Sequence, residues 1–209
     1  MSNLFPHFPV FLDLAGRAVV LLDGDESLAP LASQFLAAGA GVSVFDPAPS
    51  DAMRALAPPL RLKLRRWRPA DFGGARLVIA GEGEPRPQRA HTAAHAIGAV
   101  FHLVGAPEQS DVALGGVSAR GALSIGVSAP GIPAALAEAV QARLEQALPA
   151  GLSDFLEAAE RARPEAERRL ADAAARERFW AALGAAALDM QIVGAAAWDH
   201  FIAARLGEA

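Results

Sequence analysis

Acidic side chains gather at a turn between two segments that have the pattern of secondary structure. Residues 19–22 (VVLL) have the composition of a buried parallel strand, and the acidic turn at residues 23–27 (DGDES) follows directly. Apolar residues at helical spacing continue to Gly39, and a second apolar strand, residues 42–45, ends at Asp46. Strand, turn, helix, strand and terminal acid is the order of a dinucleotide-binding βαβ unit, whose turn meets a pyrophosphate.

The side chains of this turn disfavour the binding of a dinucleotide. The fingerprint G-x-G-x-x-G/A places glycine where the chain turns and where its backbone approaches the pyrophosphate. Here Asp23, Asp25 and Leu28 stand at those positions, and Gly24 occupies a variable one. Two like charges about 5 Å apart cost roughly 3 kcal/mol at an effective dielectric constant near 20. We therefore predict the fold of a dinucleotide-binding domain together with weak dinucleotide binding.

Composition narrows the classes of protein to which the chain can belong. The 209 residues carry a formal net charge of -4, which argues against general nucleic-acid binding. The sequence has no cysteine, which excludes disulfides, thiolate metal sites and a cysteine nucleophile. The sequence contains no run of about 18 uncharged apolar residues, so we predict no membrane span. The first residues lack the features of a signal peptide. We expect a cytoplasmic protein that binds neither nucleic acid nor membrane.

Further strands and helices extend the first unit into an α/β domain. Apolar residues 77–80 and 100–104 predict two more strands, residues 88–98 predict a helix, and residues 61–68 predict an edge strand guarded by basic side chains. From residue 111 the pattern changes to short paired strands and then to helices. We predict a Rossmann-like parallel-sheet domain, a small α+β dimerisation domain and a C-terminal helical domain, at residues 1–107, 108–149 and 150–209.

The C-terminal half is predicted to be helical, and one of its helices predicts an oligomer. Residues 132–148 form an amphipathic helix, and residues 152–206 form further helices with a boundary at residues 161–164, where a proline occurs. One face of the 132–148 helix is small and apolar, and the preceding strands are too few to bury a core alone. A two-fold contact between copies is the commonest solution, so we expect a homodimer.

Three histidines could do chemistry, and each has a structural alternative. His102 lies in an apolar strand and is either a core or cleft-wall histidine or a proton carrier. His91 and His95 lie four residues apart and share one helix face. A metal site needs a further ligand, and the sequence has no H-E-x-x-H pattern. We therefore predict a surface pair and no metal site.

The order of these motifs resembles the precorrin-2 dehydrogenase family, which includes the N-terminal module of siroheme synthases. The similarity runs in order through roughly residues 5–182, and its most specific part is residues 124–149, SIGVSAPGIPAALAEAVQARLEQALP. Shorter matching segments are FPVFLDLAGR, FLAAGAGVSV, LVIA and RERFW. The resemblance implies NAD-dependent oxidation of precorrin-2 to sirohydrochlorin by a homodimer, and some members of the family also insert ferrous iron.

The resemblance also implies site residues. Those at the NAD site are Asp23, Gly24, Asp25, Glu26, Ser27, Asp46, Pro47 and Ala48. Those at the cleft for an anionic tetrapyrrole are Arg120, Ser128 and His102. The catalytic aspartate of the family falls on Gly105, which can neither accept a proton nor orient a metal, so no catalytic residue is assigned. The candidate substitutes are His102, Glu82 and Glu84, of which the two glutamates are otherwise solvated loop acids.

The sequence is compatible with two functions. The first is a precorrin-2 dehydrogenase that acts with NAD. The second is a non-catalytic dimer of the same fold that binds a tetrapyrrole or a partner protein. The resemblance favours the first, whereas the replaced turn glycines and Gly105 favour the second.

Overall fold

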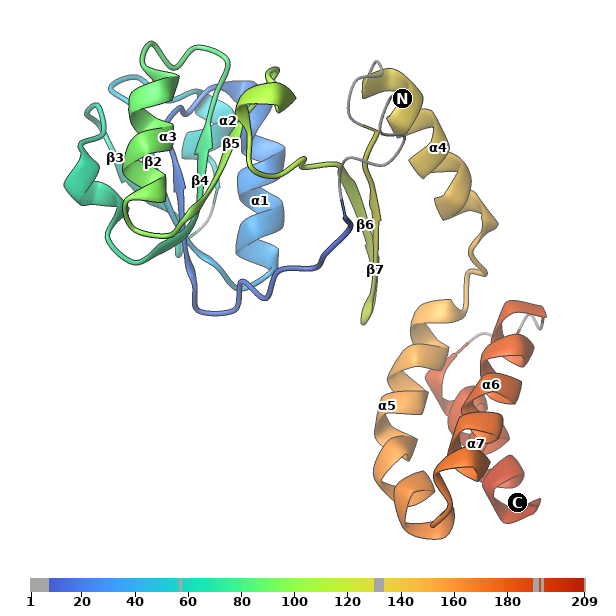
Figure 1. Ribbon diagram of the computed structural model, residues 1–209. Helices are drawn as coiled ribbons and strands as arrows, with labels where there is room; N and C mark the ends of the chain where they lie inside the picture. Colours follow the sequence, from blue (N-terminus) through green and yellow to red (C-terminus); the bar gives the residue numbers. More distant parts are fainter. Residues whose placement is uncertain (1–7, 57, 130–133, 190–191, 193, 209) are drawn as a thin grey trace, which may run out of the picture. The chain divides into compact units, whose positions relative to one another are not determined.

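The chain divides into two compact units, residues 1–114 and residues 115–209. A computed structural model describes residues 8–56, 58–129, 134–189, 192 and 194–208 (Figure 1). The three-domain division at residues 107 and 149 stays a prediction.

Five parallel strands form the sheet of the first unit, in the order β3-β2-β1-β4-β5. They are β1 Ala18–Leu21, β2 Gly41–Phe45, β3 Arg61–Lys63, β4 Ala75–Ala80 and β5 Val100–Leu103. The strand order changes direction between β1 and β4, which opens a crevice at the carboxyl ends of the strands. The predicted Rossmann-like sheet is confirmed.

Helices cover both faces of this sheet (Figure 1). They are α1 Ala29–Ala37, α2 Asp51–Arg54 and α3 Pro87–His95. Phe35 of α1 and Met53 of α2 pack with Val19 in one buried cluster. Ala94 of α3 packs with Val20 in a second cluster, on the other face. Successive residues of β1 therefore point to opposite layers, as the period of a strand requires.

The connection between β1 and α1 ends in a 3-10 turn, η1 (Glu26–Leu28), which directly precedes α1. Asp25 caps it, because its carboxylate accepts the Leu28 N–H. Gly39 ends α1 with φ +78, a conformation that glycine adopts without strain. The predicted strand, turn, helix and strand are present in this order.

The predicted edge strand at residues 61–68 is too long, since only β3 pairs with β2. After Lys63 the chain turns inward because Trp67 is buried, with its ring 5.1 Å from that of Phe72. Arg65 forms a 2.7 Å ion pair with Asp71 and holds this bend. Burial of one tryptophan therefore overrides the alternating pattern of the segment.

In the part of the second unit that the structure describes, the chain forms a β-hairpin and four helices. They are β6 Gly116–Arg120, β7 Leu123–Val127, α4 Ala134–Ala147, α5 Leu152–Arg169, α6 Ala173–Asp189 and α7 Ala195–Glu208. The hairpin is antiparallel. Phe155 of α5 and Trp198 of α7 pack edge to face, with ring centroids 4.9 Å apart, in the core of α5, α6 and α7. Residues 132 and 133 of the predicted helix lie outside the described residues.

The predicted helix boundary at residues 161–164 is wrong, because α5 continues through Pro164. Pro164 is exposed, so its ring meets solvent. Ala158 and Ala166, on either side of it, are both buried in the helical core. Tertiary packing of both halves outweighs the hydrogen bond that the proline removes. No helix among the described residues has both the length and the apolar character that crossing a bilayer requires.

Candidate functional site

Four loops of the first unit meet at one edge of the sheet. Because β1, β2, β4 and β5 are parallel, the residues that follow them lie at the same, carboxyl edge. Asp23 follows β1 and Asp46 follows β2, while Gly81 follows β4 and Gly105 follows β5. The edge includes the point between β1 and β4 at which open α/β sheets bind ligands.

Carboxylates at this edge accept hydrogen bonds from the backbone of the turn itself. The Gly24 N–H donates to Asp46 Oδ2 at 2.9 Å. The Asp25 N–H donates to Asp23 Oδ1 at 3.2 Å. The Leu28 N–H donates to Asp25 Oδ1 at 3.1 Å. In a glycine-rich turn, backbone N–H groups face the pyrophosphate. Here three of them already bind anions that the chain supplies.

The side chain of Asp23 fills the space between the ends of β1 and β4. A Cβ atom at Gly81 would lie 2.8 Å from both Cβ and Oδ2 of Asp23. Burial raises the pKa of Asp23, the charges of Asp25 and Asp46 and a hydrogen bond to Asp46 raise it further, and a hydrogen bond from Gly24 opposes them. The crowding of like charges therefore disfavours the ionised form of Asp23.

The other predicted cofactor residues surround the same turn. Glu26 and Ser27 are exposed, and the Ser27 hydroxyl donates to Asp25 Oδ1 at 2.6 Å. Pro47 and Ala48 are also exposed, and the Ala48 N–H donates to the carboxylate that ends β2. The structure therefore gathers the predicted residues at one edge, and cofactor binding by them stays a prediction.

A cavity of about 150 Å³ opens beside the turn. Its lining includes Asp23, Asp46, Arg66, Trp67 and Glu84. Pockets that enclose small molecules typically measure about 300–1,000 Å³. In this conformation the cavity is too small to enclose a dinucleotide.

Glu84 is not the solvated loop acid that the sequence suggested. It is buried with 7% of its surface exposed. Its Oε2 accepts the Trp67 indole N–H at 2.7 Å, and its Oε1 accepts the Arg86 N–H at 2.9 Å. The indole needed a partner once it was buried, and Glu84 provides it. With both oxygens engaged, Glu84 holds the loop after β4 in place.

Glu82 reaches the position at which the catalytic aspartate was expected. Gly105 has φ +79, and a Cβ atom built on it would lie 2.8 Å from Glu82 Oε1. Glu82 is exposed at the carboxyl edge. Its carboxylate therefore occupies the space that a side chain at residue 105 would fill.

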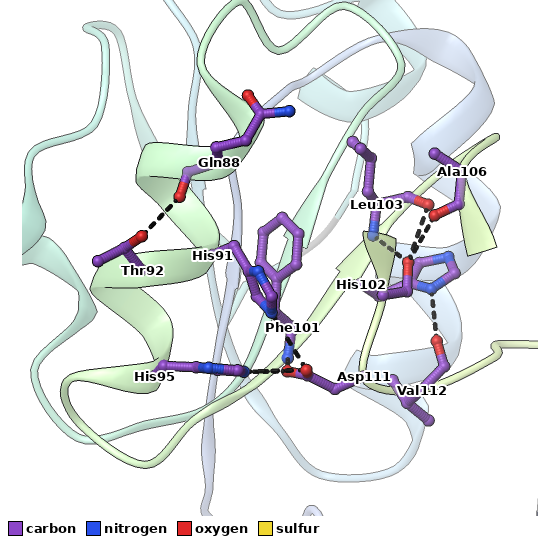
Figure 2. Close-up of polar contacts among 11 residues, drawn as sticks. Gln88, His91, Thr92, His95, Phe101, His102, Leu103, Ala106, Asp111 and Val112 are labelled. Carbon is purple, nitrogen blue, oxygen red and sulfur yellow. Dashed lines mark hydrogen bonds and ion pairs between the residues drawn. The ribbon is translucent and has the colours of Figure 1, made fainter. Parts of the chain in front are cut away.

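His102 faces a backbone carbonyl. Its Nδ1 lies 2.8 Å from the Val112 oxygen (Figure 2), and because a carbonyl only accepts, Nδ1 carries the proton. Burial lowers the pKa of His102, and the bond to Val112 opposes that shift in part. The neutral imidazole leaves only Nε2 as an acceptor.

His91 and His95 acquire a partner that the sequence did not reveal. Asp111 Oδ1 lies 3.1 Å from His91 Nε2, and Asp111 Oδ2 lies 2.8 Å from His95 Nε2 (Figure 2). The two histidines come from α3, whereas Asp111 follows β5 in sequence. The helical spacing of the histidines was a visible signal, but their proximity to Asp111 depends on the fold.

The predicted tetrapyrrole residues divide between the units. Arg120 and Ser128 belong to the second unit, and His102 belongs to the first. Arg120 Nη2 donates to the Glu145 carbonyl at 3.2 Å, so the guanidinium contacts the last turn of α4. Ser128 is exposed. Their contact with a substrate stays a prediction.

Several known proteins are similar to this chain in sequence or in fold. No family model matches the chain. The siroheme synthase of Chromobacterium violaceum is 33% identical over 176 residues, which cover 83% of this chain and 37% of that protein. Siroheme synthase 1 of Halorhodospira halophila is 31% identical over 179 residues, with 83% and 37% covered. Among solved structures, that of SirC, a precorrin-2 dehydrogenase, gives a TM-score of 0.73 at 15% identity, over 97% of this chain and 100% of that one.

The fold and its acidic sheet edge define a Rossmann-like α/β protein with an added hairpin and helical unit. The chain belongs to the siroheme synthase family, which its motifs indicated. It spans 37% of the length of the Chromobacterium violaceum relative.

The strain of the acidic cluster predicts a pH-dependent stability change. Because its folded-state pKa is raised above the ordinary 3.8, Asp23 contributes stability at low pH that is lost as the pH rises through the folded-state pKa. Asp23→Asn, which resembles the protonated acid, should raise the Tm at pH 7 and change it much less at pH 3.5. Glu108→Gln, at an exposed acid of the same unit, is the control. An equal effect at both pH values, or a lower Tm at pH 7, would contradict the account.

Proposed function

We propose that this chain acts at the step from precorrin-2 to sirohydrochlorin, as a dehydrogenase homologue that binds an anionic tetrapyrrole and oxidises it slowly, with weakly bound NAD as the hydride acceptor. Support comes from the similarity to siroheme synthases over 83% of the chain. The likeness to SirC supports the fold. We expect the oxidation to be slow because carboxylates of the chain already accept the hydrogen bonds of three N–H groups in the turn at the carboxyl edge of the sheet.

The residues of the turn do not fit the pyrophosphate of NAD. Its binding would have to displace carboxylates from the N–H groups of Gly24, Asp25 and Leu28. The displaced carboxylates would then face the pyrophosphate charge, which costs roughly 3 kcal/mol per pair at about 5 Å. The helix N-terminus that follows offers an anion only about 0.3–1 kcal/mol. We therefore expect NAD to bind weakly.

Glycine at both acidic positions should restore affinity for NAD. The double variant Asp23→Gly, Asp25→Gly removes two charges and frees the N–H groups of residues 25 and 28, while the Gly24 N–H keeps its bond to Asp46. Calorimetric titration should show binding by the variant at least tenfold tighter than by the wild type. The control is Glu26→Gln, which removes one exposed charge next to the turn and frees none of these amides. A wild-type Kd in the low micromolar range would refute the claim.

The carboxylate that remains near the expected catalytic position is that of Glu82. Residue 105 supplies no acid or base, and Glu82 Oε1 lies where its side chain would be. Glu84 is committed to Trp67 and Arg86. We propose Glu82 as the group that exchanges a proton with the tetrapyrrole.

A single substitution tests this role. Acid-base catalysis by one positioned group is typically worth about 10²- to 10⁴-fold. Glu82→Gln should therefore lower the rate of precorrin-2 oxidation by about that factor, and Glu108→Gln should leave it unchanged. Gly105→Asp should help only when combined with Glu82→Ala, because the new side chain otherwise collides with Glu82. A Glu82→Gln protein with full activity would show that Glu82 takes no part.

A second candidate function is a non-catalytic dimer that binds a tetrapyrrole or a partner protein. Gly105 and the self-satisfied turn favour it, since both remove chemistry while the packing of the fold persists. Binding of sirohydrochlorin without any turnover of precorrin-2, by the wild type and by the glycine variant, would support this alternative.

An apolar surface on α4 supports the proposed homodimer. Leu136, Val140 and Leu144 recur every four residues and expose 54%, 47% and 42% of their surfaces. Val117 of β6 is also exposed, at 45%. An apolar stripe on one helix face is the kind of self-complementary surface that a two-fold axis buries.

Light scattering tests the dimer. The wild type should elute with twice the mass of the 21.6 kDa chain at micromolar concentration. The double variant Val140→Glu, Leu144→Glu should give the mass of one chain, because the new charges would lie in the apolar stripe that the dimer buries. Gln146→Glu changes an exposed polar residue of the same helix and should leave the dimer intact. A wild-type protein with the mass of a single chain would exclude this interface.

A further inference from the structure

We propose that His91, His95 and Asp111 form a binding site for one divalent transition-metal ion, of the class of Zn²⁺, Co²⁺ and Ni²⁺. Nothing in this proposal depends on the proposed oxidation, because the site lies elsewhere on the first unit. Among the described residues, these three offer one ligand atom each, and the three atoms all lie within 4.8 Å of one another.

The distances suit an ion after a small adjustment. His91 Nε2 lies 3.1 Å from Asp111 Oδ1, and His95 Nε2 lies 2.9 Å from the same oxygen. Zinc binds imidazole nitrogen and carboxylate oxygen at about 2.0–2.2 Å, so two ligands at a tetrahedral angle are about 3.3 Å apart. Each histidine nitrogen therefore needs to move only a few tenths of an ångström away from the Asp111 oxygen to admit an ion.

The site is held in place from both sides. The Phe101 N–H donates to Asp111 Oδ2 at 2.8 Å, and the Asp111 N–H donates to the Phe101 carbonyl at 2.9 Å. The ring of His91 packs against that of Phe101, with centroids 5.0 Å apart (Figure 2). A ligand carboxylate that accepts a further hydrogen bond is the usual supporting arrangement around a bound metal.

The carboxylate is ready to act as a ligand. The hydrogen bond from the Phe101 N–H favours the charged form of the carboxylate, which is the form that binds a metal. His95 lies in the last turn of α3, where the negative end of the helix dipole favours a cation.

The ligand types select the ion. Two imidazoles and one carboxylate suit Zn²⁺, Co²⁺ or Ni²⁺, whereas Mg²⁺ and Ca²⁺ prefer oxygen ligands alone. The side chains of His91 and His95 are 35% and 53% exposed, so an ion and its remaining water ligands have access from solvent.

The site is separate from the acidic edge of the sheet. Asp111 accepts a hydrogen bond from Phe101, which lies near the start of β5, whereas Gly105 follows the end of that strand. Four residues of strand span about 13 Å. The ion would join the end of α3 to the segment that leads out of the first unit, which indicates a stabilising role.

Titration with metal ions tests the proposal directly. Metal-free full-length protein is titrated with Co²⁺ and followed by visible absorption, and Zn²⁺ is added to displace it. We expect one ion per chain and a Tm that rises with Zn²⁺ concentration, because the ion binds only the folded state. His95→Ala and Asp111→Asn should each weaken binding at least 10- to 100-fold. His200→Ala, at an exposed histidine of α7, should leave it unchanged.

Asp111→Asn keeps an oxygen for the Phe101 N–H, so its Tm without metal reports whether the fold survives. Absence of Co²⁺ binding at millimolar concentration would overturn the proposal and leave a histidine–carboxylate ion pair. Binding that His95→Ala and Asp111→Asn leave unchanged, or that His200→Ala weakens equally, would also overturn it.

Discussion

The hydrogen bonds between the turn after β1 and its own carboxylates govern this structure. Parallel strands bring their carboxyl ends together, and the N–H groups of the first turn must find acceptors there. In this chain Asp23, Asp25 and Asp46 supply them. The turn is therefore complete without a ligand, and the shape of the fold is kept while three of its turn N–H groups are already bonded to carboxylates of the chain.

Much of the fold could be predicted because its signals are local. Buried parallel strands appear as short apolar runs, and helix ends carry caps and glycines such as Gly39. The errors arose where tertiary packing overrode local preference. Trp67 draws the chain away from the sheet after β3, and the packing of Ala158 and Ala166 carries α5 through Pro164.

The candidate sites were harder to predict because they depend on partners distant in sequence. The sequence predicts a loop acid at Glu84 because it does not show the hydrogen bond to Trp67, 17 residues away. Glu82 and Gly105 come together only because β4 and β5 are neighbours. His91 and His95 had the spacing of metal ligands, but Asp111 joins them only through its pairing with Phe101.

The central claim is that the turn amides are already occupied, and NMR can observe them one by one. The amide resonances of Gly24, Asp25 and Leu28 are followed in the wild type as NAD is added. The account predicts that these three resonances show no saturable shift below millimolar NAD, and that the amides of residues 25 and 28 shift at lower concentration in the Asp23→Gly, Asp25→Gly variant. A saturable shift of the three wild-type amides at low micromolar NAD would contradict it.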